Sequence, residues 1–250
     1  MSGHSKWSTI KRAKGITDAK RGAVFTKLAN TITMAVREGG GADPNFNFRL
    51  RLAIDKGHEA NMSKDLIARA IDRGAGKGGE GTTLESVVYE GFAPNGVALM
   101  IECVTDNKNR ANGEIKTLLV KAGGSLGSTG SVGYLFRKRG EIIINKSAVQ
   151  SPNRSVDPDI VLEMAMEAGA EDMSEDDKYY YFFTETTDLH KIRIALEEQG
   201  LTIDSAELTY MPNRETMVTI TDETKAQQVI NVLEALEELD DVHNVYSNLG

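Results

Sequence analysis

The sequence predicts an α+β protein of three domains: a small N-terminal helical domain followed by two α+β domains of the ferredoxin-like type. Three observations support this fold class. Apolar residues recur at helix spacing through most of residues 18–73, and β-branched strands alternate with helices beyond a glycine-rich hinge at residues 74–81. The sign of the charge also changes across that hinge.

Composition bounds the class of protein. The chain of 250 residues is long enough for two or three small domains, and its 40% hydrophobic and 26% charged residues are typical of a globular protein. The longest apolar run, Val97–Ile101, is far shorter than the roughly 20 residues of a membrane span, and no secretory signal follows the basic start. A single cysteine, Cys103, excludes an internal disulfide, so we expect a cytoplasmic protein.

Helix start and stop signals divide the N-terminal domain. The first helix is expected from Asp18 to Arg37, after a mobile arm. Asp43-Pro44 offers a cap followed by proline at the first helical position, which predicts a second helix running to about Ala60. Ser63 is the expected cap of a third helix, with Gly74 at its C-terminal side.

Beyond the hinge, the sequence predicts two α+β domains. One is discontinuous, 80–136 plus 212–250, because its own strands are too few for a stable sheet and the tail is expected to return to it. The other, 137–211, is acidic and shows a β-α-β-β-α-β-like order. Strands are expected at 86–91, 97–104, 131–136, 141–145, 179–184, 205–210, 216–221 and 242–246, and helices at 109–121, 158–169, 188–199 and through 229–236.

The net charge of −8 hides a segregation of charge along the chain. Residues 1–79 hold 15 Lys and Arg against 7 Asp and Glu, a net charge of +8, whereas residues 80–250 hold 14 against 30, a net charge of −16. Charges are screened over about 8 Å at physiological salt, so a separate acidic domain does not cancel the basic one. This basic domain (residues 1–79) is therefore expected to bind a polyanion.

No catalytic constellation emerges. The segment Gly74–Gly79 satisfies G-x-G-x-x-G, but it follows a helix and precedes a strand, which favours a hinge over a phosphate-binding loop. The four histidines lack the spacing of a metal site, and the acidic runs lack the spacing of a calcium loop. We expect a protein that is not an enzyme, with no metal, no cofactor and no small-molecule substrate.

The N-terminal arm, in contrast, combines cations with the only tryptophan of the chain. Lys and Arg neutralise phosphates and an indole can stack on an unpaired base, although the same residues could form a solvated basic surface with the tryptophan in the helical core. The candidate nucleic-acid-binding residues of the basic domain are Lys6, Trp7, Lys11, Arg12, Lys14, Lys20, Arg21, Lys27, Arg49, Arg51, Lys64, Arg73 and Lys77.

Several long motifs follow one another along almost the whole chain. They are Gly3-His4-Ser5-Lys6-Trp7, Phe25-Thr26-Lys27-Leu28, Asn47-Phe48-Arg49-Leu50-Arg51-Leu52-Ala53-Ile54, Asn61-Met62-Ser63-Lys64-Asp65, Tyr89-Glu90-Gly91-Phe92, Thr105-Asp106-Asn107-Lys108-Asn109-Arg110, Gly130-Ser131-Val132 and residues 239–248. In this order they resemble the YebC family of probable transcriptional regulators, which includes mitochondrial translational activators of cytochrome c oxidase synthesis. Phe46 and Phe48 are more apolar than is usual in the family, which indicates extra packing or a contact surface.

The resemblance implies three domains around a cleft, no enzyme activity, no cofactor, and nucleic-acid binding in the control of gene expression. It leaves two functions open. One is a DNA-binding transcriptional regulator, and the other is a ribosome-associated translation factor that binds ribosomal RNA and eases translation of proline-rich stretches. We place the transcriptional role first, although no recognition helix for a DNA groove can be identified. A protein-interaction adaptor, bound through the acidic domains, is the more distant alternative.

Overall fold

A computed structural model describes residues 21–77, 84–151, 154–155 and 158–250. The chain divides into two compact units. Of the described residues, one unit contains those from Leu135 to Met217, and the other contains those from Arg21 to Tyr134 together with Val218–Gly250. In the described part of the chain, no helix combines the length and the apolar character needed to cross a membrane.

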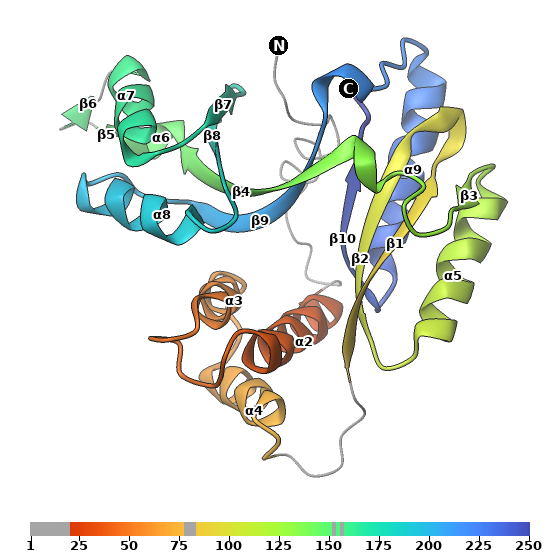
Figure 1. Ribbon diagram of the computed structural model, residues 1–250, viewed down its shortest axis with the longest axis horizontal. Helices are drawn as coiled ribbons and strands as arrows, with labels where there is room; N and C mark the ends of the chain where they lie inside the picture. Colours follow the sequence, from red (N-terminus) through yellow and green to blue (C-terminus); the bar gives the residue numbers. More distant parts are fainter. Residues whose placement is uncertain (1–20, 78–83, 152–153, 156–157) are drawn as a thin grey trace. The chain divides into compact units, whose positions relative to one another are not determined.

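Three helices form the N-terminal part, as the sequence predicts (Figure 1). They are α2 (Arg21–Glu38), α3 (Phe48–Glu59) and α4 (Lys64–Gly74). Their inward faces bury Ile32, Leu50 and Ile67, around which smaller and partly buried apolar residues pack. The predicted cap of α4 is confirmed, since the Ser63 hydroxyl accepts a hydrogen bond from the Leu66 N–H.

The predicted start of the second helix is wrong by four residues. Asp43-Pro44 begins a turn instead, in which the Asp43 carbonyl accepts hydrogen bonds from the N–H groups of Phe46 and Asn47. The helix cap is Asn47, whose side chain accepts from the Leu50 N–H. A cap-plus-proline pattern therefore started a tight turn here: the Asp43 side chain accepts from the Asn45 N–H, while Asn47 both caps the helix and donates to the carbonyls of Ala35 and Gly41.

The first sheet brings together the middle and the tail of the chain. Its strands lie in the order β10-β2-β1-β3, with every neighbouring pair antiparallel. The tail strand thus pairs with β2, as the sequence led us to expect. The elements are β1 (Glu85–Phe92), β2 (Ala98–Thr105), α5 (Lys108–Lys121), β3 (Ser125–Leu126), α9 (Glu223–Glu238) and β10 (Val242–Ser247).

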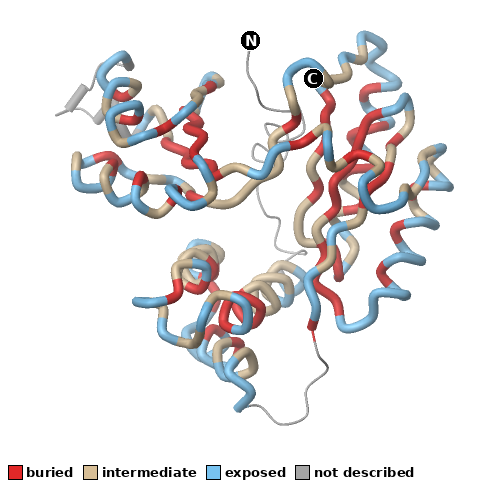
Figure 2. Tube along the Cα trace, viewed as in Figure 1, coloured by how far each residue is buried: buried red, intermediate tan, exposed pale blue. Residues whose placement is uncertain are grey.

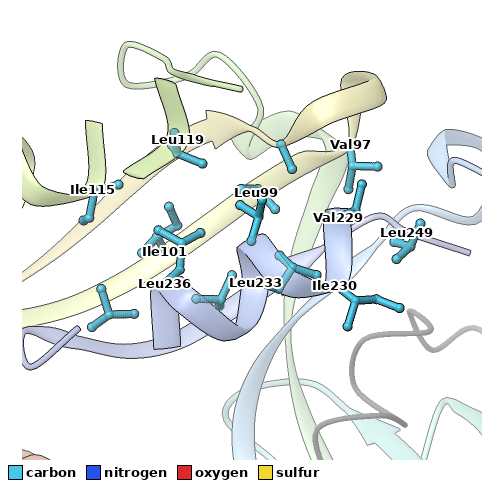
Figure 3. Close-up of a cluster of buried hydrophobic side chains, with 14 of the residues drawn as sticks. Val97, Leu99, Ile101, Ile115, Leu119, Val229, Ile230, Leu233, Leu236 and Leu249 are labelled. Carbon is cyan, nitrogen blue, oxygen red and sulfur yellow. The ribbon is translucent and has the colours of Figure 1, made fainter. Parts of the chain in front are cut away.

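The core of this sheet lies under α5 and α9 (Figure 3). Leu99 and Ile101 of β2 are fully buried, and they meet the inward face of α9, which includes Leu233. Buried positions gather on the strands, while the outer faces of the helices are exposed (Figure 2). Burying side chains of this size contributes about 1.5–3 kcal/mol each, so the tail helix is an integral part of this core.

The second sheet has the strand order β7-β8-β4-β9, again antiparallel throughout. With helices between the first and second and between the third and fourth of these strands along the chain, this is the ferredoxin-like arrangement. Its elements are β4 (Phe136–Asn145), α6 (Lys146–Val149), α7 (Pro158–Ala168), β7 (Asp172–Glu175), β8 (Tyr179–Thr184), α8 (Leu189–Glu198) and β9 (Ser205–Pro212). A two-stranded hairpin, β5 (Gln150–Ser151) and β6 (Arg154–Ser155), precedes α7.

Several sequence-based assignments of strands need correction. The strand expected at 216–221 is reduced to one bridge, between Val218 and Leu249. The strand expected at 141–145 begins earlier, at Phe136, and β7 was not anticipated because it is short and polar. The strand expected at 131–136 is absent. The three-domain boundaries remain a prediction.

A buried carboxylate explains why residues 131–135 form no strand. The Glu90 side chain accepts hydrogen bonds of 2.7 Å from the N–H groups of Gly130, Val132 and Gly133. Amides bonded to a side chain are not available to a sheet ladder. Burial alone would raise the pKa of Glu90, but these three donors stabilise the carboxylate and the pKa is lowered.

We therefore expect Glu90→Gln to lower the free energy of unfolding at neutral pH by about 1–3 kcal/mol, because an amide replaces a charged acceptor of three hydrogen bonds. A lowered pKa in the folded state contributes stability above the ordinary value of 4.5, and this contribution is lost as the pH falls below it. The variant should therefore lose less stability than the parent between about pH 7 and about pH 3.5. Urea denaturation at both pH values measures this, with Glu114→Gln on an exposed helix face as the control.

Candidate nucleic-acid interface

The candidate residues fall into two groups. Lys6, Trp7, Lys11, Arg12, Lys14 and Lys20 lie outside the described residues, and Arg21 begins α2. The remaining six, from Lys27 to Lys77, belong to the helical domain formed by α2, α3 and α4. Their surroundings differ, and they divide further into cations held by the fold and cations at the surface.

Arg73 connects two helices. Its guanidinium donates to the Thr33 hydroxyl at 3.0 Å and to the Asn30 side-chain oxygen at 2.9 Å, which joins α4 to α2. Thr33 is fully buried and also donates to the Ala70 carbonyl. Burial lowers the pKa of Arg73, and the neighbouring Arg37 lowers it further. Much of the hydrogen-bonding capacity of this arginine is thus used inside the domain.

Arg51 holds the loop between α2 and α3. Its Nε and Nη2 atoms donate to the Pro44 carbonyl at 3.1 and 2.9 Å, and Nη2 also reaches the Asn45 carbonyl at 3.2 Å. The planar guanidinium suits this forked contact, which lysine could not reproduce. Arg51 therefore fixes the shape of the loop at residues 41–47.

Lys27 ties the helical domain to the first sheet. Its Nζ atom donates to the Glu237 carbonyl of α9 at 2.6 Å. One turn further along α2, the Thr31 hydroxyl lies 3.0 Å from Nδ1 of His243 in β10. A small apolar contact between Met34, Leu84 and Val104 adds to this junction. The ammonium of Lys27 is thus placed at an internal contact.

Arg49, Lys64 and Lys77 are the surface cations of the set. Arg49 pairs with Glu38 at 3.4 Å and Lys77 with Asp72 at 3.6 Å, and all four side chains are about half exposed or more. Exposed pairs of this kind contribute about 0–1 kcal/mol, so a phosphate can compete for either cation. Both pairs lie within the helical domain, which leaves the net charge of that domain unchanged. Residues 21–77 hold ten Lys and Arg against six Asp and Glu.

The structure adds Phe46, which was not among the candidate residues. Its side chain is 87% exposed, at the end of the loop that Arg51 holds. The sequence pointed to this position, since Phe46 and Phe48 were expected to mark extra packing or a contact surface. By contrast, Phe48 is only partly exposed at the start of α3.

The glycine-rich segment after α4 begins as a helix end. The N–H groups of Ala75, Gly76 and Lys77 donate to carbonyls of the last turn of α4, and Gly76 has a φ of +76°. Amides that close a helix do not point at a bound phosphate. The described residues of this segment therefore favour a helix end over a dinucleotide-binding loop.

The described residues contain no group of three or more His, Cys, Asp or Glu arranged to hold a metal ion. The single thiol is buried in β2, and burial together with the nearby Asp241 raises the pKa of Cys103 to about 12. A thiolate at neutral pH is therefore rare at this position, and Cys103 is a poor nucleophile.

We expect Cys103 to resist alkylation by iodoacetamide in the folded protein at about pH 8, where the thiolate fraction is about 10⁻⁴ and the sulfur is covered. Unfolding in urea should restore ordinary thiol reactivity. Mass spectrometry of the labelled protein with and without urea checks this. Complete labelling without urea within minutes would contradict the buried position.

Replacing Arg73 should lower the free energy of unfolding more than replacing Lys64. Arg73→Met keeps most of the apolar stem but leaves the Asn30 oxygen without its donor, so we expect the free energy of unfolding to fall by about 1–3 kcal/mol. Lys64→Met removes the same charge from an exposed site and should change it by less than about 0.5 kcal/mol. Urea denaturation of the two variants side by side measures the difference, and equal effects would contradict the internal role of Arg73.

Comparisons with known proteins cover almost the whole chain. The model of the TACO1/YebC protein N-terminal domain matches residues 5–77, and the model of the TACO1/YebC second and third domain matches residues 84–249. A probable transcriptional regulatory protein of Persephonella marina is 47% identical over 99% of this chain and 95% of its own length, and one of Chloroflexus aurantiacus is 48% identical over 100% and 95%. The crystal structure of a conserved hypothetical protein from Aquifex aeolicus superposes with a TM-score of 0.83 at 42% identity, covering 93% of this chain and 91% of that one.

Proposed function

Because this chain belongs to the TACO1/YebC family, we propose that it regulates gene expression by binding nucleic acid through its basic domain, residues 1–79, with promoter DNA as the first target to test. The printed names of the relatives, probable transcriptional regulatory proteins, support a regulatory role. The contact to nucleic acid is argued from this chain's own charges.

The observation that carries the proposal is the segregation of charge. The basic domain has a net charge of +8 in a chain whose remainder has −16. The pairs of Arg49 with Glu38 and of Lys77 with Asp72 are internal to this domain, so they redistribute its charge without reducing it. A polyanion approaching this end meets an excess of cations, and binding releases the counterions condensed on its phosphates.

The cations of the basic domain fall into two groups with different roles. Arg73, Arg51 and Lys27 hold the helical domain and its junction together, whereas Arg49, Lys64 and Lys77 are exposed. The arm supplies Lys6, Lys11, Arg12 and Lys14 within nine residues. We assign the phosphate contacts to the arm cations and the three exposed ones, and a framework role to the other three.

The test is the salt dependence of binding. If about five of these seven cations contact a phosphate at one time, the affinity for a duplex should fall roughly 500-fold between 50 and 200 mM salt. Replacing Lys6, Lys11, Arg12 and Lys14 by alanine should remove most of this dependence and weaken binding at low salt. Fluorescence anisotropy with a labelled promoter fragment measures both effects.

The matched control removes four lysines from exposed positions elsewhere. Lys116, Lys121, Lys191 and Lys225 lie on helices of the two α+β units, and their replacement by alanine changes the net charge by the same amount. Binding should survive this change. A flat salt response of the parent protein, or equal losses in the two variants, would overturn the proposal and favour an adaptor role.

Two further experiments identify which nucleic acid the basic domain binds: cosedimentation with ribosomes and footprinting on promoter DNA. A footprint that disappears in the arm variant supports the DNA target. Arm-dependent cosedimentation without a footprint keeps the basic domain as the binding element but moves its target to ribosomal RNA.

A further inference from the structure

From the loop between α2 and α3 we infer that Phe46 is a stacking site for an unpaired nucleobase, so that the helical domain recognises single-stranded segments rather than paired duplex alone. This inference rests on the proposed binding of nucleic acid and specifies the form of the ligand. It is carried by the exposure of the ring, by the hydrogen bonds that hold the loop, and by the excess of cations in the helical domain.

The ring of Phe46 takes almost no part in the folded structure. It is 87% exposed, whereas the other two phenylalanines of the helical domain, Phe25 and Phe48, are each partly buried. At this exposure the ring buries little apolar surface within the fold, so most of its area is open to a ligand. A flat apolar surface held in solvent is what a base can cover.

The loop holds the backbone of Phe46 firmly. The Asn47 side chain, 1% exposed, donates to the carbonyls of Ala35 at 2.8 Å and Gly41 at 2.7 Å, while its oxygen accepts from the Leu50 N–H. The N–H of Phe46 itself donates to the Asp43 carbonyl at 3.1 Å. With Arg51 clamping the Pro44 carbonyl on the other side, stacking on the ring orders little additional chain.

The space behind the loop is also full. A Cβ atom added to Gly39 would lie 2.3 Å from the Asn47 side-chain oxygen and 2.5 Å from the Ala35 carbonyl oxygen. Such a contact is impossible without displacing the loop. Glycine at this position therefore leaves room for the Asn47 side chain to reach the end of α2.

Charge favours a base over an apolar protein surface as the partner. Phe46 is flanked by the polar Asn45 and Asn47, and Arg49 is half exposed in the first turn of α3, paired to Glu38 only at 3.4 Å. Among described residues of the helical domain, the only other large hydrophobic side chain that is clearly exposed is Leu66, on α4. A single exposed ring in a domain with an excess of cations matches a base and its phosphates, whereas a protein partner would require a wider apolar patch.

The experiment compares three nucleic acids of matched length: an RNA hairpin with an unpaired loop, a blunt RNA duplex, and a single-stranded DNA with the loop sequence. We expect Phe46→Ala and Phe46→Leu to weaken binding to the hairpin about 5- to 150-fold, because the flat π surface is lost in both. Phe46→Tyr keeps the stack and should stay within about twofold. Binding to the blunt duplex should not change, nor should the slope of affinity against salt, because no phosphate contact is removed.

Leu66→Ala is the matched control, an exposed apolar side chain in the same domain whose removal should leave binding unchanged. Urea denaturation confirms that the Phe46 variants remain folded. Equal losses with the RNA hairpin and the single-stranded DNA assign the site to unpaired bases in general, and a loss with the hairpin alone assigns it to RNA loops.

Two outcomes separate this inference from the proposed function. If the arm variant loses binding while Phe46→Ala and Phe46→Leu bind the hairpin like the parent, the stacking site is wrong and the proposed function stands. If the parent protein binds none of the three nucleic acids, the stacking site is wrong, whereas the proposed function is decided by the assay with the promoter duplex. Wild-type binding by Phe46→Leu together with a loss in Phe46→Ala would assign the position to an apolar contact without stacking and overturn the inference as well.

Discussion

The pairing of β10 with β2 is the interaction on which the architecture depends. It joins residues about 140 positions apart, and it brings α9 onto the core that α5 and β2 would otherwise leave open. The last residues extend the same junction, since the Ala98 N–H donates to the Asn248 side chain at 2.7 Å and the Val218 N–H to the Asn248 carbonyl at 2.8 Å. Contacts so distant in sequence cost more loop-closure entropy than local ones, and a high share of them slows folding.

In the helical domain, some cations stabilise the packing of the helices and others remain exposed at the surface. Arginines at the helix junctions donate to carbonyl and amide oxygens in geometry that an ammonium group could not match, while the cations with weak partners stay outside. A buried amide, Asn47, fixes the loop from which Phe46 projects. The stretch 43–51 thus combines a loop fixed by buried hydrogen bonds with the guanidinium groups of Arg49 and Arg51.

Much of this could be predicted from the sequence, and the failures have physical causes. The periodicity of apolar residues located α2, α5 and α9, because it depends only on the local sequence. The return of the tail was predicted from the number of strands, because the middle segment alone has too few for a stable sheet. The strand expected at 131–136 failed because Glu90, forty residues away, takes its amide groups, a partner that no local window contains. For the candidate binding residues, the sequence shows which side chains are charged, but it does not show which groups each side chain contacts. Arg73 and Lys64 therefore looked alike, although only Arg73 bridges two helices.

The acidic unit leaves and rejoins the rest of the chain at a single narrow point. Its first and last strands, β4 and β9, are antiparallel neighbours, and the Asn213 N–H donates to the Leu135 carbonyl at 2.8 Å where they begin and end. For the other sheet, the inserted segment is therefore a connection whose two ends are already held together, whatever sequence lies between them. Closing a loop costs free energy that grows slowly with its length, and a loop with bonded ends costs little more than a short turn. Lengthening, shortening or exchanging this unit would thus leave the closure of the other sheet almost unaffected, which makes it the part of the molecule freest to diverge.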